Sequence, residues 1–245
     1  MMALYGFFGY GYGFGYGYDP MFIWVFIIAI ISMVASAKVN STYSKYNKVR
    51  STSGLTGAQA AERILHSAGI YDVSIQRVGG QLTDHYDPRN KVLRLSDATY
   101  GSASVAAVGV AAHECGHALQ HHEEYVPLKF RSALVPVANI GSRWGLPIIL
   151  LGFFFSAFSF LVPVGIFVFS FSVLFQLVTL PVEFNASRRA LVLLKEQGIL
   201  EEREVGQSRK VLSAAALTYV AAAAASIVQL LRLILIFGGG RRRDD

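Results

Sequence analysis

The sequence predicts a mainly α-helical membrane protein with about four transmembrane helices and a soluble section of α+β type. Of its 245 residues, 53% are hydrophobic and only 16% are charged, and the mean hydropathy is +0.43. These values are too apolar for an ordinary soluble domain. The other observation behind the prediction is a short polar motif, His-Glu-Cys-Gly-His at 113–117, at the end of a modest apolar run.

The chain carries 22 basic and 16 acidic residues, a net charge of +6. In so apolar a chain we interpret the excess as positive charge flanking a membrane, and we expect no nucleic-acid partner. The single cysteine, Cys115, excludes an internal disulfide framework. It lies about 200° around a helix from His113, so we expect it to pack in the interior rather than to bind metal.

The first transmembrane helix is predicted at 21–37, after a Gly/Tyr-rich low-complexity tail at 1–20. No basic residue precedes the apolar run, so it lacks the charged start of a signal peptide and is interpreted as a retained anchor. Four basic residues follow within 13 positions: Lys38, Lys45, Lys48 and Arg50. Positive charge favours the cytoplasmic side, so the soluble section that follows, 38–143, is expected in the cytoplasm.

Within that section the pattern predicts a helix from Thr56 to about His66, ended by Gly69. Alternation and turn residues then predict three short strands, at 71–78, 82–86 and 91–95. The motif helix follows at about 102–124. Its apolar lead-in of about ten residues is too short to cross a bilayer, so the site should lie at the membrane surface, which argues against an intramembrane protease.

The rest of the chain is predominantly apolar. Residues 144–182 contain no charge and predict a transmembrane hairpin with its turn at 162–165. A helix and charged loop at 183–210 precede a C-terminal apolar helix at 211–237, which is rich in alanine and should pack closely on the other spans. A basic tail, 238–245, closes the chain. Four full spans would place this tail outside, so either the last helix does not fully cross or the tail is an exception to the positive-inside tendency.

The motif at 113–117 has the pattern H-E-x-x-H. On a helix, residues four apart share a face, so His113 and His117 can bind one metal ion. Glu114 lies about 100° further round, where it can reach a metal-bound water without binding the metal itself. A catalytic zinc site requires a third protein ligand.

Glu183 is the best candidate for that ligand. His121 and His122 lie about 12 Å along the helix from His113, too far to share one ion. The longer pattern in which a glycine turn returns a third histidine is absent. The predicted hairpin, by contrast, returns the chain to the same membrane face, where Glu183 begins a new helix.

Several segments resemble the YugP-type family of membrane zinc metallopeptidases, over most of the chain from about residue 38 to residue 190. They are S-T-Y-S-K-Y (41–46), R-S-T-S-G-L-T-G (50–57), L-T-D-H-Y-D-P-R (82–89), A-A-H-E-C-G-H-A (111–118), A-L-V-P-V-A-N (133–139) and L-P-V-E-F-N-A-S-R-R-A (180–190). The resemblance implies a zincin-like catalytic domain and peptidase activity.

The layout is also similar, more distantly, to membrane metalloproteases that pair H-E-x-x-H with a glutamate in E-x-x-A-D on a later helix. This similarity implies that Glu183 is the ligand of a glutamate-type zincin, with Ser187 at the position of the aspartate. Because serine stands in place of that aspartate, the residues that orient the histidines are left unassigned. Three carboxylates are candidates: Asp84, Asp87 and Asp97.

Together these observations predict a membrane-embedded, Zn²⁺-dependent endopeptidase in which Glu114 is the general base on zinc-bound water. His85 or Tyr86 is a possible oxyanion or substrate contact. The expected partners are a peptide or membrane-protein substrate and the lipid bilayer, and the oligomeric state is left open. The expected location is the cell membrane, as a multi-pass protein. Two alternatives remain: a non-catalytic membrane zinc-binding or zinc-sensing protein, and a membrane scaffold in which the motif is accidental.

Overall fold

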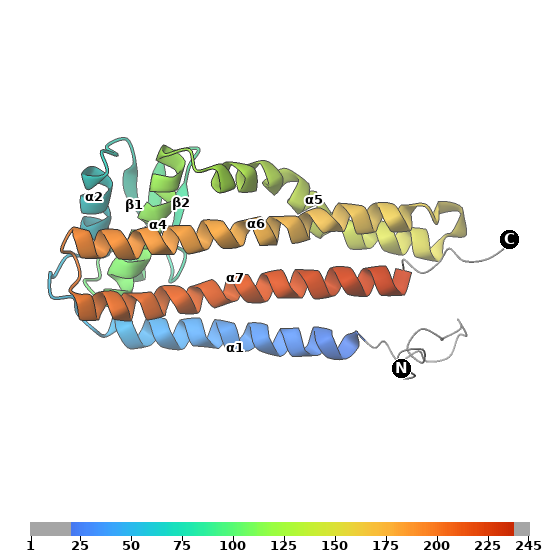
Figure 1. Ribbon diagram of the computed structural model, residues 1–245, viewed down its shortest axis with the longest axis horizontal. Coiled ribbons are helices and arrows are strands. Elements are labelled where there is room, and N and C mark those ends of the chain that lie inside the picture. The colour runs from blue at the N-terminus through green and yellow to red at the C-terminus, as the bar shows by residue number, and fades with distance from the viewer. Residues whose placement is uncertain (1–20, 238–245) are drawn as a thin grey trace, which may run out of the picture.

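The computed structural model describes residues 21–237, so the predicted tails at 1–20 and 238–245 lie outside the described residues. Four helices in this range are long and apolar enough to cross a membrane: α1 (Phe22–Asn47), α5 (Val126–Phe154), α6 (Leu161–Glu196) and α7 (Glu202–Phe237). They form an elongated bundle with a small α+β domain at one end (Figure 1). The predicted fold class, a mainly α-helical membrane protein with some β structure, is confirmed.

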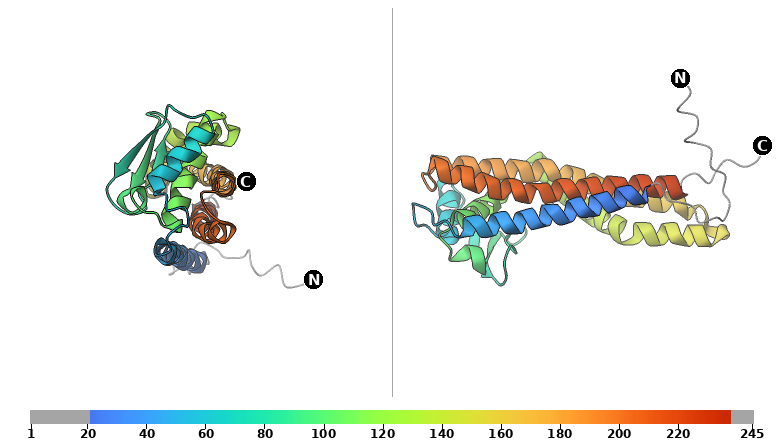
Figure 2. Two further views of the ribbon diagram at one scale, coloured as in Figure 1. Left: turned by 90° about the vertical axis from the view of Figure 1, so that its left-hand side faces the viewer. Right: turned by 90° about the horizontal axis from the view of Figure 1, so that it is seen from below.

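The small domain contains a three-stranded sheet, β1 (Ser74–Val78), β2 (His85–Asp87) and β3 (Val92–Ser96). The strand order is β1-β3-β2, with β1 parallel and β2 antiparallel to β3. Three helices complete it: α2 (Gly57–Ser67), α3 (Asp97–Tyr100) and α4 (Val105–His122). Figure 2 shows the sheet at the margin of the molecule, away from the long helices.

Local sequence explains where the helices of the small domain begin. The Thr56 hydroxyl accepts a hydrogen bond from the Gln59 amide and the Gln59 side chain accepts one from Thr56 N–H, a reciprocal cap at the start of α2. The Ser104 hydroxyl likewise accepts from Ala107 N–H at the start of α4. The motif helix therefore begins three residues later than the sequence predicted.

The predicted hairpin differs from the observed one in its turn. The chain reverses at 155–160, around the short 3₁₀ turn η1 (Ser156–Phe158), and not at 162–165. Pro163 lies in the first turn of α6, where the missing N–H of proline breaks no helical hydrogen bond. Residues 163–165 therefore belong to the first turns of α6, and the prediction of a chain reversal there is wrong. Helix α5 also begins earlier than expected, at Val126, and Figure 1 shows it bent, as expected from Pro136 and Pro147 inside it.

The core of the small domain surrounds α4. One face of α4 packs on α2 and β3, and the other packs on the ends of α6 and α7 that enter the domain. Cys115 lies in this core with its Sγ 3.6 Å from the Ala61 carbonyl oxygen, which confirms its packing role. Burial raises the pKa of its thiol, so it is not a thiolate ligand.

Two glycines of α4 allow the long helices to approach it. A Cβ at Gly116, inside the motif, would lie 2.6 Å from the Ala186 carbonyl oxygen on α6. A Cβ at Gly109 would lie 2.2 Å from the Ser208 Oγ on α7. Glycine is thus required at 116 because the backbone of α6 lies directly against it. This contact fixes how far Glu183, three residues before Ala186, can be from the motif histidines.

We therefore expect Gly116→Ala to separate α6 from α4. Overpacking of this kind costs about 1–3 kcal/mol of stability, and the displaced Glu183 should weaken zinc binding. The matched control is Gly206→Ala in α7, where a new Cβ meets nothing within 4 Å. Thermal unfolding and zinc content of the purified variants check this. Equal zinc content in Gly116→Ala and in the control would show that the α4–α6 contact does not set the site.

Candidate metal centre

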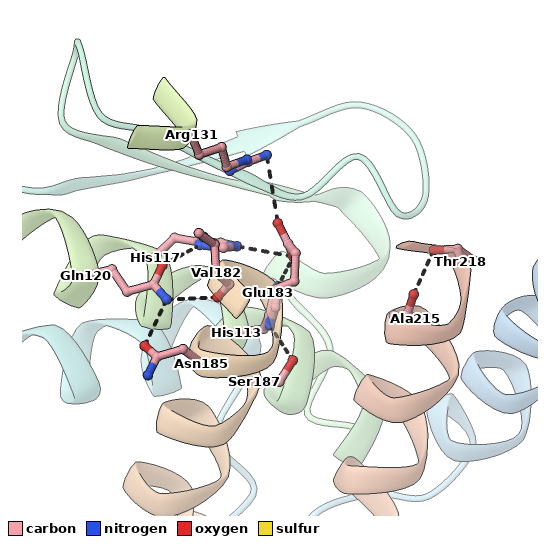
Figure 3. A network of polar contacts seen from close by, with 10 residues as sticks. All are labelled: His113, His117, Gln120, Arg131, Val182, Glu183, Asn185, Ser187, Ala215 and Thr218. Atoms are coloured by element: carbon pink, nitrogen blue, oxygen red, sulfur yellow. Dashed lines mark hydrogen bonds and ion pairs between the residues drawn. The ribbon is translucent and has the colours of Figure 1, made fainter. Parts of the chain in front are cut away.

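The three residues predicted as metal ligands lie together. His113 and His117 come from consecutive turns of α4, and Glu183 comes from α6 (Figure 3). The Glu183 Oε2 lies 3.3 Å from the His113 Nε2 and 3.6 Å from the His117 Nε2. One ligand atom from each residue lies within 4.8 Å of the others. Glu183 thus lies beside the motif helix, as the sequence predicts.

These distances fit a zinc ion. Bonds of about 2.0–2.1 Å in tetrahedral geometry place neighbouring ligand atoms about 3.3–3.4 Å apart. The Glu183 Oε2 is also buried and has no hydrogen-bond partner among residues 21–237, while its side chain is only 3% exposed. A buried carboxylate oxygen without a partner is costly unless a cation compensates it. Two imidazoles and a carboxylate are the ligand set of several catalytic zinc sites.

His117 is oriented so that Nε2 is the nitrogen available to a metal. Its Nδ1 lies 3.1 Å from the Gln120 Oε1, a carbonyl oxygen that can only accept, so Nδ1 carries a hydrogen and Nε2 faces Glu183. The Gln120 amide is fixed in turn, because its Nε2 donates at 2.9 Å to both the Val182 carbonyl and the Asn185 Oδ1. Gln120 thereby ties α4 to α6 on both sides of Glu183.

Burial alone would lower the pKa of His117. The Glu183 carboxylate and the negative charge of Glu114 outweigh burial and raise this pKa above its ordinary value. The surroundings of His117 therefore favour a positive charge at this point.

His113 is oriented by Ser187, whose hydroxyl lies 3.1 Å from the His113 Nδ1. The serine thus contacts the histidine from the position at which the more distant proteases carry aspartate. The prediction that Asp84, Asp87 or Asp97 orients the histidines is wrong. Each of these carboxylates is bound within the small domain: Asp84 by Ser96, Asp87 by Asn90 and Arg94, and Asp97 by Arg77 and Gly80.

Glu183 also has a partner on the side away from the imidazoles. The Arg131 Nη2, from α5, lies 3.8 Å from the Glu183 Oε1 (Figure 3). One carboxylate oxygen therefore faces the histidines and the other faces a guanidinium. This arrangement favours a single bond from Glu183 to a metal, through Oε2. Sequence reasoning missed Arg131, because no motif connects it to residues 52 positions away.

Glu114 lies beside the ligands without being one of them. It is 8% exposed, and it makes no hydrogen bond or ion pair with any residue that the structure describes. It follows His113 directly on α4, and its charge acts on His117. A carboxylate next to the metal ligands, with no partner of its own, is suited to accept a proton from a reacting molecule.

His85 and Tyr86 are not brought to the ligands by any contact that the described residues make. The His85 Nδ1 bonds the Thr83 carbonyl at 2.9 Å. The Tyr86 hydroxyl bonds the His121 Nδ1, also at 2.9 Å, and burial raises its pKa to about 12, so it stays a neutral donor. His121 bonds Tyr86, a contact that the sequence did not predict, and lies outside the ligand cluster, as its spacing from His113 predicts.

Comparison with known proteins agrees with this geometry. Residues 21–238 match the family described as "Putative neutral zinc metallopeptidase". The match covers all four long helices and the small domain. The chain belongs to this family.

A curated relative is the "Putative membrane protease YugP" of Bacillus subtilis (strain 168). It is 48% identical to this chain over 201 residues, which are 82% of this chain and 89% of the relative. No solved structure matches the chain. The resemblance inferred from the sequence segments is therefore confirmed.

The partners of the ligands generate a prediction. Gln120→Leu removes the hydrogen bond to His117 at nearly constant volume, and loss of such a partner typically lowers metal affinity about 10–100-fold. Ser187→Ala should act in the same direction through His113. Isothermal titration of the metal-free protein with Zn²⁺ measures both. Ser213→Ala, an exposed serine of α7, is the control, and an affinity of Gln120→Leu equal to that control would contradict an orienting role for Gln120.

Proposed function

We propose that this family member is a membrane-embedded, zinc-dependent endopeptidase that hydrolyses peptide bonds of proteins or peptides at the membrane surface. One observation carries the proposal: two motif imidazoles and the buried Glu183 oxygen converge to within 4.8 Å of one another, beside the unpartnered carboxylate of Glu114. Two further findings support it: membership of the zinc metallopeptidase family, and the similarity to the relative named "Putative membrane protease YugP".

His113, His117 and Glu183 would hold the zinc ion. When bound, zinc lowers the pKa of a water molecule towards about 7 and polarises a carbonyl group. The His113 and His117 Nε2 atoms would be available to bind the ion, because Ser187 and Gln120 contact the Nδ1 atoms. Burial keeps bulk water from competing with the substrate.

Glu114 would perform the proton transfers. Its carboxylate accepts a proton from the attacking water as the new C–O bond forms and the carbonyl π electrons move onto oxygen. The electrons then return, the C–N bond breaks, and Glu114 gives the same proton to the leaving amine. The products are a carboxylic acid and an amine, and Glu114 is regenerated.

We further propose that the site faces the cytoplasm. The helix ends that enter the small domain carry basic residues, among them Lys45 and Lys48 after the apolar part of α1 and Arg188 and Arg189 after that of α6. Figure 1 shows these ends of α1 and α6 at the end of the bundle that holds the small domain. Positive charge at that end favours the cytoplasmic side of a cell membrane. Glu183 lies where the uncharged part of α6 ends, which supports a site at the membrane surface.

A non-catalytic zinc-binding protein would use the same three ligands, and one pair of variants separates the two functions. Glu114→Gln keeps size and packing but cannot accept the proton, so hydrolysis should fall about 10²–10⁴-fold while zinc stays bound. Glu183→Ala removes a ligand and should lose both zinc and hydrolysis. Metal analysis and cleavage of a fluorescently labelled casein by protein purified in detergent provide the two measurements.

Hydrolysis unchanged by Glu114→Gln would overturn the proposed mechanism. Zinc retained at parent stoichiometry in Glu183→Ala would overturn the ligand set. Stoichiometric zinc in a parent protein that cleaves no peptide would favour the non-catalytic alternative.

A further inference from the structure

Two side chains near Glu183 have no part in the mechanism so far. Arg131 approaches from α5, and its 3.8 Å distance to the Glu183 Oε1 is longer than the 2.7–2.9 Å of a closed, charge-assisted hydrogen bond. Its Nε is buried and has no hydrogen-bond partner among residues 21–237. The Phe175 ring lies under the guanidinium, 5.8 Å from its central carbon. Arg131 is thus held beside the site with donors still free.

Tyr219 approaches from α7, which packs against both α4 and α6. Its side chain is half-buried, and the charges of Glu183, Glu114 and Arg131 act on its hydroxyl. Tyr219 therefore lies in the neighbourhood of the site, on a helix that packs against both helices of the ligand cluster. In Figure 3 its chain neighbour Thr218 is on the α7 segment that faces Glu183.

We propose that Arg131 and Tyr219 bind the carbonyl oxygen of the scissile peptide bond and stabilise the negative charge that develops on it. This inference rests on the proposed peptidase function and names two catalytic residues that the sequence motif does not contain. Attack by water moves the carbonyl π electrons onto oxygen while the proton goes to Glu114. Donors placed in advance around that oxygen, in a site shielded from water, stabilise this charge most effectively.

The chemistry of the two groups suits this role. Arginine carries five N–H donors in a rigid plane and stays charged, and a tyrosine hydroxyl can donate while neutral. The contact with Glu183 leaves the Arg131 Nε buried without a partner, and an unsatisfied buried donor is unfavourable. An oxygen arriving with the substrate would provide the acceptor. Tyr86, the sequence-based candidate, has its hydroxyl engaged by His121.

The test uses the full chain, purified in detergent and loaded with zinc. The variants are Tyr219→Phe, Arg131→Lys and Arg131→Gln, with Tyr86→Phe as the competing assignment and Arg143→Gln, an exposed arginine of the same helix, as control. Four quantities are measured for each: zinc content, kcat and KM for casein-derived fluorogenic peptides, and the dissociation constant of a phosphonamidate dipeptide by isothermal titration. The phosphonamidate group mimics the tetrahedral, anionic intermediate.

Loss of one such donor typically lowers kcat about 10²–10³-fold. We expect Tyr219→Phe to do so with unchanged KM and zinc content, and to weaken phosphonamidate binding by a similar factor. Arg131→Lys should retain more activity than Arg131→Gln because it keeps the charge, and Arg143→Gln should match the parent.

Three results would overturn the inference: an unchanged kcat in Tyr219→Phe and Arg131→Gln, a loss of activity that only follows loss of zinc, or a fall in kcat for Tyr86→Phe in place of Tyr219→Phe. If the parent cleaves no peptide, the proposed function fails. Phosphonamidate binding then tests by itself whether Arg131 and Tyr219 bind an anionic oxygen. Weaker binding by Tyr219→Phe would support the pocket, and binding equal to that of the parent would refute it.

Discussion

The close contact between α4 and α6 is the constraint on which the site depends. Gly116 has no side chain, so the backbone at Ala186 can lie against the motif helix. Glu183 is three residues away on the same helix, almost one turn, and therefore faces the two histidines. Gln120 then joins the two helices by bonding His117 on one side and the Val182 carbonyl on the other. The distance between α4 and α6, which Gly116 keeps short, thus sets the distance between Glu183 and the two histidines.

The site also brings several charged side chains together where they are shielded from water. Glu114 and Glu183 are both buried, and Arg131 is the guanidinium that faces Glu183. A pair of buried carboxylates next to neutral imidazoles is unfavourable without further positive charge. A divalent cation held by the two imidazoles and Glu183 would supply it, so metal binding and the stability of this part of the fold should be coupled. The raised pKa of His117 has the same physical origin.

The long helices do more than anchor the chain. Helices α5, α6 and α7 each bring a functional side chain to the small domain: Arg131, Glu183 and Tyr219. The motif helix supplies the rest. The proposed catalytic unit is therefore not the small domain alone, since the candidate third ligand and the proposed oxyanion donors belong to helices that continue along the bundle. A change in how these helices pack would alter the metal centre directly, which offers a physical route by which a surrounding membrane could influence activity.

The sequence by itself determined the class of fold, the four apolar helices, the two histidine ligands and the neighbouring glutamate. These follow from hydropathy and from spacing along one helix, which are local properties. It also predicted Glu183, because two spans must return the chain to the same face and resemblance to known zinc metallopeptidases pointed to that residue. It misplaced the hairpin turn, since Pro163 and Gly165 suit a helix start as well as a turn. Only the tertiary structure decided that Gln120 and Ser187 orient the histidines and that Arg131 and Tyr219 approach from other helices. Their proximity depends on helix rotation and interhelical distance, which side-chain packing sets and no local pattern encodes.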